Sequence, residues 1–292
     1  MKYAIFAFLA TLIWAFNFVI SRSLGDSFPP MALAFFRNFI PILVLTPFIY
    51  KTFIKELKAI KKNSAHIFYL SLCGMSAFIA LLYAATKLTN VINLSILSVT
   101  SPIFIVLISK FYLKRKVHLL QLTGVFVSFL GVIYIVSAGN VSVLMSLSFS
   151  LGDLFMLIAA IMWAIYCLLI EKEVKGVSEY TLLYTMFLFA MIINVPLFLY
   201  EYFFVSQFII TQANIYAILY VGVFTSLVAY IFWNKANIAL GSFKVGLIYY
   251  LLPIESALAS QLILGEKIQT FHLVGFFLIL LGIFISNHYS KK

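Results

Sequence analysis

The stretch Ala85–Gly131, ATKLTNVINLSILSVTSPIFIVLISKFYLKRKVHLLQLTGVFVSFLG, is present twice in this chain. Its second copy begins 151 residues later, at Ala236, and the two copies align without a gap. Leucine matches mean little in so apolar a sequence, but proline and glycine matches are informative. These are Pro102 with Pro253, Gly124 with Gly275, and Gly131 with Gly282. We infer a duplicated unit of about 150 residues, since a long internal repeat sets the architecture.

A weaker repeat brings the beginnings of the two units into register. At an offset of 149 residues, Trp14 matches Trp163 and Pro47 matches Pro196. The chain has only 3 tryptophans and 7 prolines, so these matches carry weight. We therefore predict a first repeat over residues 1–140 and a second over residues 150–289.

The composition indicates a membrane protein. Of the 292 residues, 64% are hydrophobic and 10% are charged, which is more apolar surface than a soluble domain can bury. Apolar runs of about 20 residues recur, and that length crosses a hydrocarbon core of about 30 Å. The runs do not alternate between apolar and polar residues, which favours helices over a β-barrel. The run that starts at Tyr3 has no cleavage site behind it and is predicted to be a membrane helix rather than a signal peptide.

The sequence predicts an all-α integral membrane protein with ten transmembrane helices. Short connections separate the helices, except for a basic surface segment at Lys51–Ser64. The predicted spans are 3–22, 30–50, 65–86, 91–112, 118–138, 150–170, 180–200, 214–236, 243–264 and 271–289.

The distribution of lysine and arginine predicts the orientation. With the N-terminus inside, the inner face holds the basic segments 51–62, 110–116 and 172–175, whereas the outer connections 139–149 and 201–213 hold no Lys or Arg. Both termini are then cytoplasmic. Because each repeat has an odd number of spans, the two five-helix repeats are inverted, an architecture that places a substrate site near the midplane of many transporters.

Two repeat-related prolines fall near the middle of their spans. Pro102 and Pro253 lack an amide hydrogen, so the carbonyls of Ser98 and Tyr249 lose their helical partners. Freed carbonyls in lipid need a side chain, a water or a ligand. Asn93 and other polar residues lie nearby, which favours a cavity wall. Ordinary packing between helices remains the alternative.

Two ionisable residues lie at membrane depth. An unpaired charge there costs about 3 kcal/mol or more, so Arg37 and Glu255 are expected to face protein or water. They could pair with each other or bind the two ends of a zwitterion, and Glu255 could carry a coupling proton. A structural role for Arg37, satisfying backbone carbonyls, is equally open.

Aromatic and amide side chains complete the predicted site. Trp14 and Trp163 lie inside their spans rather than at the interface, where most membrane tryptophans are found, and they could stack on a flat or cationic ligand. Packing is the alternative. The predicted lining of a central substrate cavity is Trp14, Asn17, Arg37, Asn93, Ser98, Trp163, Tyr166, Tyr230, Asn234, Tyr249 and Glu255.

Other classes of function find little support. The four histidines lie at different helix ends without a carboxylate cluster, so neither a metal site nor an enzyme is expected, and no cofactor is predicted. The net charge of +11 is explained by topology rather than by nucleic-acid binding. Gly124 and Gly131, with their counterparts Gly275 and Gly282, are predicted to form packing seams.

A set of segments in both repeats matches a known family pattern: 14–19, Pro29–Arg37, Gly152–Ala164, Tyr230–Lys235, Ala239–Gly241, Pro253 and Gly265–Lys267. In these segments the chain resembles the EamA-domain permeases of the drug/metabolite transporter superfamily. The resemblance covers nearly the whole chain and implies ten helices in two inverted repeats and export of amino acids, related metabolites or drugs across a bacterial inner membrane. Two features depart from the family pattern. The Gly-Glu-basic motif at Gly265–Lys267 is Lys-Arg-Lys in the first repeat, and the position of Glu255 is more commonly small or apolar.

The resulting hypothesis is a secondary transporter that moves a small polar or zwitterionic metabolite, outward, by alternating access. The expected partners are the substrate, the lipid bilayer and a coupling proton. A multi-substrate drug or cation exporter and a nucleotide-sugar or cofactor uptake permease are the alternatives within transport, and a membrane scaffold is the alternative outside it. The oligomeric state stays open, with a homodimer as one alternative.

Overall fold

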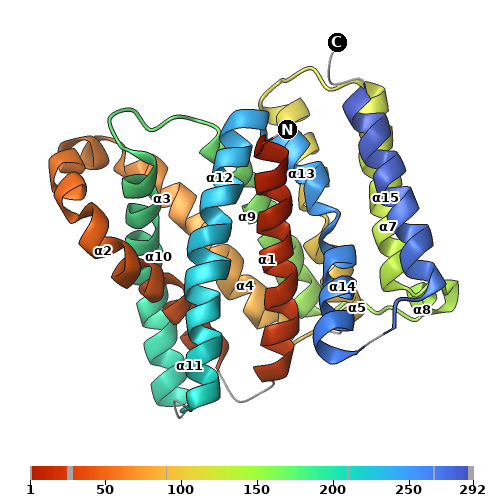
Figure 1. Cartoon of the computed structure of the whole chain (residues 1–292), viewed down its shortest axis with the longest axis horizontal. Helices are drawn as coiled ribbons and strands as arrows, with labels where there is room; N and C mark the ends of the chain where they lie inside the picture. The colour runs from red at the N-terminus through yellow and green to blue at the C-terminus, as the bar shows by residue number, and fades with distance from the viewer. Residues whose placement is uncertain (1, 25–28, 90, 209–210, 266, 289–292) are drawn as a thin grey trace.

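The computed structural model describes residues 2–24, 29–89, 91–208, 211–265 and 267–288. Glu266 of the Gly-Glu-Lys motif lies outside the described residues. Every described secondary-structure element is helical (Figure 1). Eight helical stretches are long and apolar enough to cross a membrane, and two shorter apolar helices cover Lys2–Asn17 and Thr270–Ser286. The described part of the chain therefore confirms an all-helical membrane protein with ten spans.

The first repeat supplies five of these spans. Two are single helices at its start, and one is a single helix at its end. The third and fourth spans are composite, and each contains one π-helical turn. The elements are α1 (Lys2–Leu24); α2 (Pro30–Lys62); α3 (Ser64–Ser71), η2 (Leu72–Ser76) and α4 (Ala77–Thr86); α5 (Val91–Ser98), α6 (Ser101–Leu107) and η3 (Ile108–Tyr112); and α7 (Leu119–Val136).

The second repeat follows the short helix α8 (Val141–Met145) and has the same plan. Its third span is again interrupted by a π-helical segment, and its fourth span is again broken. The elements are α9 (Leu151–Ile170); α10 (Glu179–Phe204); α11 (Gln212–Leu219), η4 (Tyr220–Val228) and α12 (Ala229–Leu240); α13 (Ser242–Tyr249) and α14 (Leu252–Leu264); and α15 (Thr270–His288).

The two repeats run in opposite directions. α1 begins and α15 ends at the same edge of the bundle (Figure 1). Near the start of α9, Asp153 accepts a hydrogen bond of 3.0 Å from Asn93, which lies near the start of α5 at the opposite edge. α9, the first span of the second repeat, therefore begins at the edge of the bundle where the fourth span of the first repeat begins, opposite to the edge where α1 begins. The predicted inverted arrangement is what the helices adopt.

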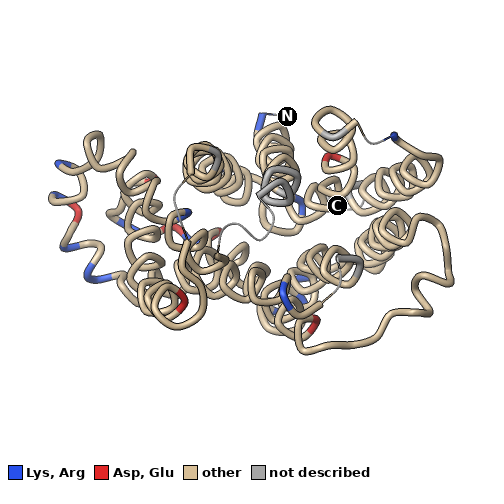
Figure 2. Tube along the Cα trace, turned by 90° about the horizontal axis from the view of Figure 1, so that it is seen from below, with Lys and Arg blue, Asp and Glu red and all other residues tan. Residues whose placement is uncertain are grey.

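The predicted basic segment Lys51–Ser64 is mostly exposed, but it is not a connection separate from the second span. α2 continues without interruption from Pro30 to Lys62, over 33 residues. Such a helix is about 50 Å long, so it extends beyond the hydrocarbon core. Lys and Glu are good helix formers, and Ile60 still packs into the core. The lysines of this extension lie at one end of the molecule (Figure 2).

The predicted glycine seam is present between α7 and α15, which lie side by side at one end of the bundle (Figure 1). A Cβ atom on Gly124 would lie 2.5 Å from the carbonyl oxygen of Gly282, and one on Gly131 would lie 2.8 Å from that of Gly275. These glycines therefore allow direct backbone contact, which is how membrane helices pack closely.

Candidate substrate site

Both prolines that were expected to interrupt helices do so. The fourth span breaks between α5 and α6 at residues 99–100, and Pro102 occupies the first turn of α6. The ninth span breaks between α13 and α14 at residues 250–251, with Pro253 in the first turn of α14. Proline fits a first helical turn because its missing amide would have no partner there. The carbonyl of Ser98 lies 3.4 Å from the Ser101 hydroxyl, which supplies a local donor.

A cluster of aromatic side chains fills the centre of the bundle beside these breaks. Neighbouring rings have centroids 4.9 to 6.3 Å apart, the range in which tilted and edge-to-face pairs are favourable. Both repeats contribute rings, and five spans meet here. This aromatic cluster consists of Trp14 of α1, Phe78 of α4, Trp163 and Tyr166 of α9, Tyr230 and Trp233 of α12, and Tyr249 of α13.

The two repeat-related tryptophans are direct neighbours. Trp14 and Trp163 meet edge to face with centroids 5.4 Å apart. The Trp14 indole nitrogen donates a hydrogen bond of 3.0 Å to the carbonyl oxygen of Thr225 in η4. A π-helical segment leaves carbonyls outside the regular ladder and is frequent at functional sites. The duplication therefore places one tryptophan from each repeat at the contact between the repeats.

Polar ends of the cluster are bonded to neighbouring helices. The Tyr166 hydroxyl donates to Oδ1 of Asn234 at 2.5 Å, and the Tyr230 hydroxyl donates to the carbonyl oxygen of Gly74 at 2.5 Å. Gly74 lies in η2 against the ring of Tyr166, where any Cβ would collide with that ring. Asn17 joins the same region, because its Oδ1 accepts from Thr225 Oγ1 at 3.4 Å.

Arg37 of α2 brings a positive charge to the aromatic cluster. The residue is 8% exposed, and its guanidinium interacts electrostatically with the hydroxyls of Tyr230 and Tyr249. Across the described part of the chain, no carboxylate lies within ion-pair distance of Arg37. A buried guanidinium beside tyrosine rings can receive a carboxylate in a bidentate manner.

Three predicted site residues lie elsewhere. Asn93 belongs to a separate network, where its amide donates to Asp153 and to the Ser148 carbonyl, both at 3.0 Å. The Ser98 hydroxyl donates to the Ser95 carbonyl at 2.9 Å, one turn back in its own helix. Glu255 contacts Thr11 of α1 at 3.0 Å. Pairing of Arg37 with Glu255, which was one of the alternatives for these two residues, is not formed among the described residues.

Sequence reasoning missed several polar contacts and two rings of the aromatic cluster, Phe78 and Trp233. Trp233 is fully buried in the aromatic cluster, and its spacing of three residues from Tyr230 is the helical signal that could have found it. Glu201 accepts from the backbone amides of Met31 and Ala32, at 2.8 and 2.9 Å, at the start of α2. No local pattern marks a partner 170 residues away.

A charged network closes the edge of the bundle where α9 ends. Glu171 accepts from Nη2 of Arg115 at 2.7 Å and from both the backbone amide and the hydroxyl of Ser242 at the start of α13. Burial raises the pKa of the Glu171 carboxyl, but the hydrogen bonds from Arg115 and Ser242 outweigh it and leave the pKa below its ordinary value. We call Arg115, Glu171 and Ser242 the edge network.

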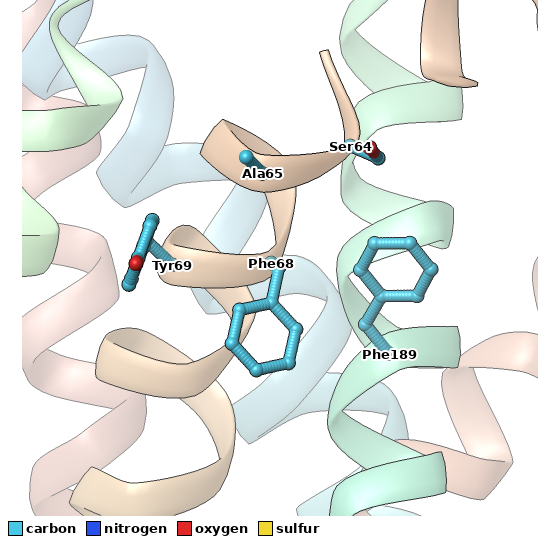
Figure 3. A pocket seen from close by; sticks show the side chains of 5 residues that line it. All are labelled: Ser64, Ala65, Phe68, Tyr69 and Phe189. Atoms are coloured by element: carbon cyan, nitrogen blue, oxygen red, sulfur yellow. The ribbon is translucent and has the colours of Figure 1, made fainter. Parts of the chain in front are cut away.

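Surface hollows lie away from the aromatic cluster. One of about 330 Å³ is lined by residues of α3 and α10, with Phe68 and Phe189 on facing helices (Figure 3). Another, of about 490 Å³, lies near Tyr134 and Gln269. Neither of these two hollows is lined by a predicted site residue.

Comparison with known proteins identifies the family. The model of the EamA-like transporter family matches residues 1–148 and again residues 150–288. The chain belongs to the EamA-like transporter family. It is a multi-pass membrane transporter with duplicated EamA domains rather than an enzyme.

Two curated transporters and a solved structure are similar to the chain. An uncharacterized transporter of Archaeoglobus fulgidus is 29% identical over 283 residues, covering 96% of this chain and 95% of the relative. The uncharacterized transporter YyaM of Bacillus subtilis is 28% identical over 230 residues, covering 78% of this chain and 74% of that relative. A solved crystal structure superimposes with a TM-score of 0.77 at 16% identity, covering 99% of this chain and 97% of the other, which shows the shared fold.

Proposed function

We propose that this EamA transporter exports amino acids or related small metabolites across a bacterial inner membrane by alternating access. The observation that carries the proposal is a buried arginine without a carboxylate partner among the described residues, beside aromatic rings from both repeats. A substrate carboxylate would supply the negative charge that Arg37 lacks. The apolar part of the substrate would pack against the indole rings.

Alternating access would use the contacts between the two repeats. Trp14 and Trp163 meet across the repeat interface, so a substrate between them would separate α1 from α9. The broken spans α5–α6 and α13–α14 would let their two segments move independently. At the edge where α9 ends, opening would require the edge network to separate.

The orientation proposed for this function places both termini in the cytoplasm. The lysine-rich end of α2 and the basic residues at 110–116 would then lie on the cytoplasmic side, where positive residues are retained. The edge network belongs to this side, because Arg115 lies in the same basic segment. The state described here would therefore be closed toward the cytoplasm.

A cation exporter is the second candidate. The three indole rings of the aromatic cluster offer faces of the kind that bind quaternary or aromatic ammonium groups. The charge of Arg37 opposes a cationic substrate, which is the reason that the carboxylate-bearing class is preferred.

The test combines identification of the substrate with a charge variant. We expect medium from cells that express the gene to accumulate the substrate relative to medium from cells that lack it. In proteoliposomes, counterflow of individual radiolabelled amino acids would then be compared between wild type, Arg37→Lys and Arg37→Gln. Loss of a buried charged partner costs about 2–5 kcal/mol, so Arg37→Gln should weaken apparent affinity at least about 30-fold.

Lys235→Gln is the matched control, because Lys235 pairs with Glu179 at 3.7 Å with both side chains partly exposed. The apparent affinity of Arg37→Lys should lie between those of wild type and Arg37→Gln, since lysine keeps the positive charge but not the planar guanidinium that binds a carboxylate through two N–H groups. If Arg37→Gln transported a carboxylate-bearing substrate with unchanged affinity while aromatic cations competed for transport, the cation exporter would replace the proposal.

A further inference from the structure

Glu255 forms a site of its own beside the aromatic cluster. Its carboxyl lies on α14 and is 2% exposed. One oxygen, Oε1, contacts the Thr11 hydroxyl of α1 at 3.0 Å, and the other, Oε2, has no hydrogen-bond partner among the described residues. A charged carboxylate with one neutral contact and no cation is costly in a low-dielectric interior. The substrate site described above makes no use of this group.

The hydrogen bonds of Thr11 fit a neutral carboxyl. The Thr11 oxygen also lies 2.9 Å from the Phe8 carbonyl and 3.3 Å from the Ala7 carbonyl, and both of these accept only. A hydroxyl has one proton and two lone pairs. If that proton bonds the Phe8 carbonyl, the contact with Glu255 becomes a hydrogen bond when the carboxyl supplies the proton. If Glu255 is charged, the single hydroxyl hydrogen of Thr11 must point to Glu255 Oε1 and leave the Phe8 carbonyl without it.

The elements around Glu255 bring no compensating charge in their described parts. The described side chains of α1 include one cation, Lys2, which is exposed at the start of the helix. α7 has no charged residue, α13 carries Lys244 in its first turn, and α15 carries His272 near its start. The titratable side chain near Glu255 in sequence is Tyr250, a phenol that brings no positive charge and whose buried hydroxyl has no hydrogen-bond partner among the described residues. A proton is thus the cation that neutralises Glu255.

α1 connects this carboxyl to the substrate site. Thr11 and Trp14 are three residues apart, so they lie on neighbouring positions of one helix face, about 4.5 Å apart along the axis. Thr11 is fully buried and Trp14 is 7% exposed. The Trp14 indole N–H donates a hydrogen bond to the carbonyl oxygen of Thr225, and its ring packs against rings of α9, α12 and α13. A change in the Thr11–Glu255 contact therefore acts on the helix that carries a ring of the aromatic cluster.

We propose that Glu255 is a proton-binding site, separate from the substrate site, that couples proton movement to the position of α1 through Thr11. This inference rests on the transport function proposed above and adds its energy source. Thr11 is a positioning residue, because it acts through Glu255.

The proton step is balanced by water. When α1 and α14 separate on one side, water reaches the carboxyl, its O–H bond breaks, and the proton passes to water with the electron pair remaining on Glu255. On the other side, a hydronium ion returns a proton and the neutral acid can be buried again. Burial of α1 against α14 is favoured only in the protonated form, which links the conformational change to the proton.

The first experiment needs no substrate. In lipid nanodiscs at neutral pH, infrared spectroscopy of the wild-type protein should show a carbonyl stretch of a protonated carboxylic acid that is missing in Glu255→Gln. Thr11→Val should shift this band because its hydrogen bond is lost, and Thr11→Ser should restore it. If Glu255→Gln removes no such band, the carboxyl is ionised and the proposal is overturned.

The second experiment measures coupling. Proteoliposomes would be loaded with a pH-sensitive dye and supplied with the twenty amino acids in groups, with and without an imposed pH gradient. For wild type, the gradient should raise net amino-acid flux by about tenfold or more over the flux without it. For Glu255→Gln this ratio should fall to one, while the exposed control Glu173→Gln keeps the wild-type ratio.

The outcomes separate the two proposals. A wild-type ratio in Glu255→Gln would overturn the coupling role and leave the substrate proposal standing. Absence of counterflow for every amino acid in wild type would overturn the substrate class. In that case the infrared result alone decides whether Glu255 binds a proton.

Discussion

The edge network is expected to hold one side of the transporter closed, and Glu171→Gln is the variant that tests this. Glu171 joins the end of α9 to Arg115, before α7, and to Ser242, at the start of α13. Glutamine keeps the shape and an acceptor oxygen for Ser242. It removes the negative charge that Arg115 meets at 2.7 Å. The variant therefore weakens the contact between the repeats without disturbing either helix.

The size of the effect follows from the exposure of the two partners. A hydrogen bond between charged groups contributes about 1.5–3 kcal/mol when it is buried. The side chain of Glu171 is 15% exposed but that of Arg115 is 47% exposed, so solvent screens part of this. About 1–2 kcal/mol remains, which corresponds to about a 5- to 30-fold rise in the population of the open state.

The native Cys167 provides the assay. Its side chain is fully buried in α9, and its carbonyl accepts from the Ser242 hydroxyl at 2.7 Å. In a Cys73→Ser background in nanodiscs, the rate of maleimide labelling at Cys167 should report opening of this edge. Glu171→Gln should label about 5 to 30 times faster than wild type. The control Glu173→Gln makes the same charge change at an exposed position two residues away.

The pH dependence has a defined sign. The pKa of Glu171 is lowered from 4.5 in the closed state, because the hydrogen bonds from Arg115 and Ser242 outweigh burial. The closed state is therefore favoured by this group above about pH 4.5, and the advantage is lost as pH falls through the lowered pKa. The readout is the labelling rate of Glu171→Gln divided by that of wild type, because the pH dependence of the thiol's own reactivity is the same in both and cancels. This ratio should stay constant down to about pH 4.5 and approach one as the pH falls through the lowered pKa of Glu171. A ratio of one at neutral pH would refute the edge network as a closing contact.

Two further substitutions test the packing. Gly282→Ala places a Cβ against the backbone carbonyl of Gly124 and against Ser128, atoms of α7 that cannot give way. The free energy of unfolding should fall by about 1–3 kcal/mol in a denaturant titration followed by intrinsic fluorescence. Equal stability of Gly282→Ala and the exposed control Leu280→Ala would contradict the seam. Tyr230→Phe leaves the buried carbonyl of Gly74 without its donor and should cost about 1–3 kcal/mol in the same titration. The exposed Tyr50→Phe should change little, and a similar result for both would show that the Gly74 contact contributes nothing.

The spans, the duplication and the inversion could all be predicted because each depends on properties that are local in sequence. A run of about 20 apolar residues must cross the membrane as a helix wherever it occurs. The break at Pro102 follows equally from its missing amide. The end of α2 was missed because composition gives the point at which a helix leaves lipid, not the point at which it ends. Lysine, a good helix former, carries α2 on to Lys62.

The site was only partly predictable. Trp14, Trp163 and Tyr230 lie together, whereas Asn93 bonds to Asp153 and Glu255 to Thr11. Depth along a helix can be counted from sequence, whereas the direction in which a side chain faces cannot be read from a helix that is apolar on all sides.

The amino-acid sequence by itself therefore determined the number of helices, their alternating direction, the two broken spans and the membrane as solvent. The tertiary structure alone decided which polar groups share a site: Arg37 with the aromatic cluster, and Glu255 apart from it. The physical reason is that hydrophobicity fixes insertion one helix at a time. Rotation and close approach are instead set by contacts between helices, such as the glycine seam of α7 and α15, whose partners lie far apart in the sequence.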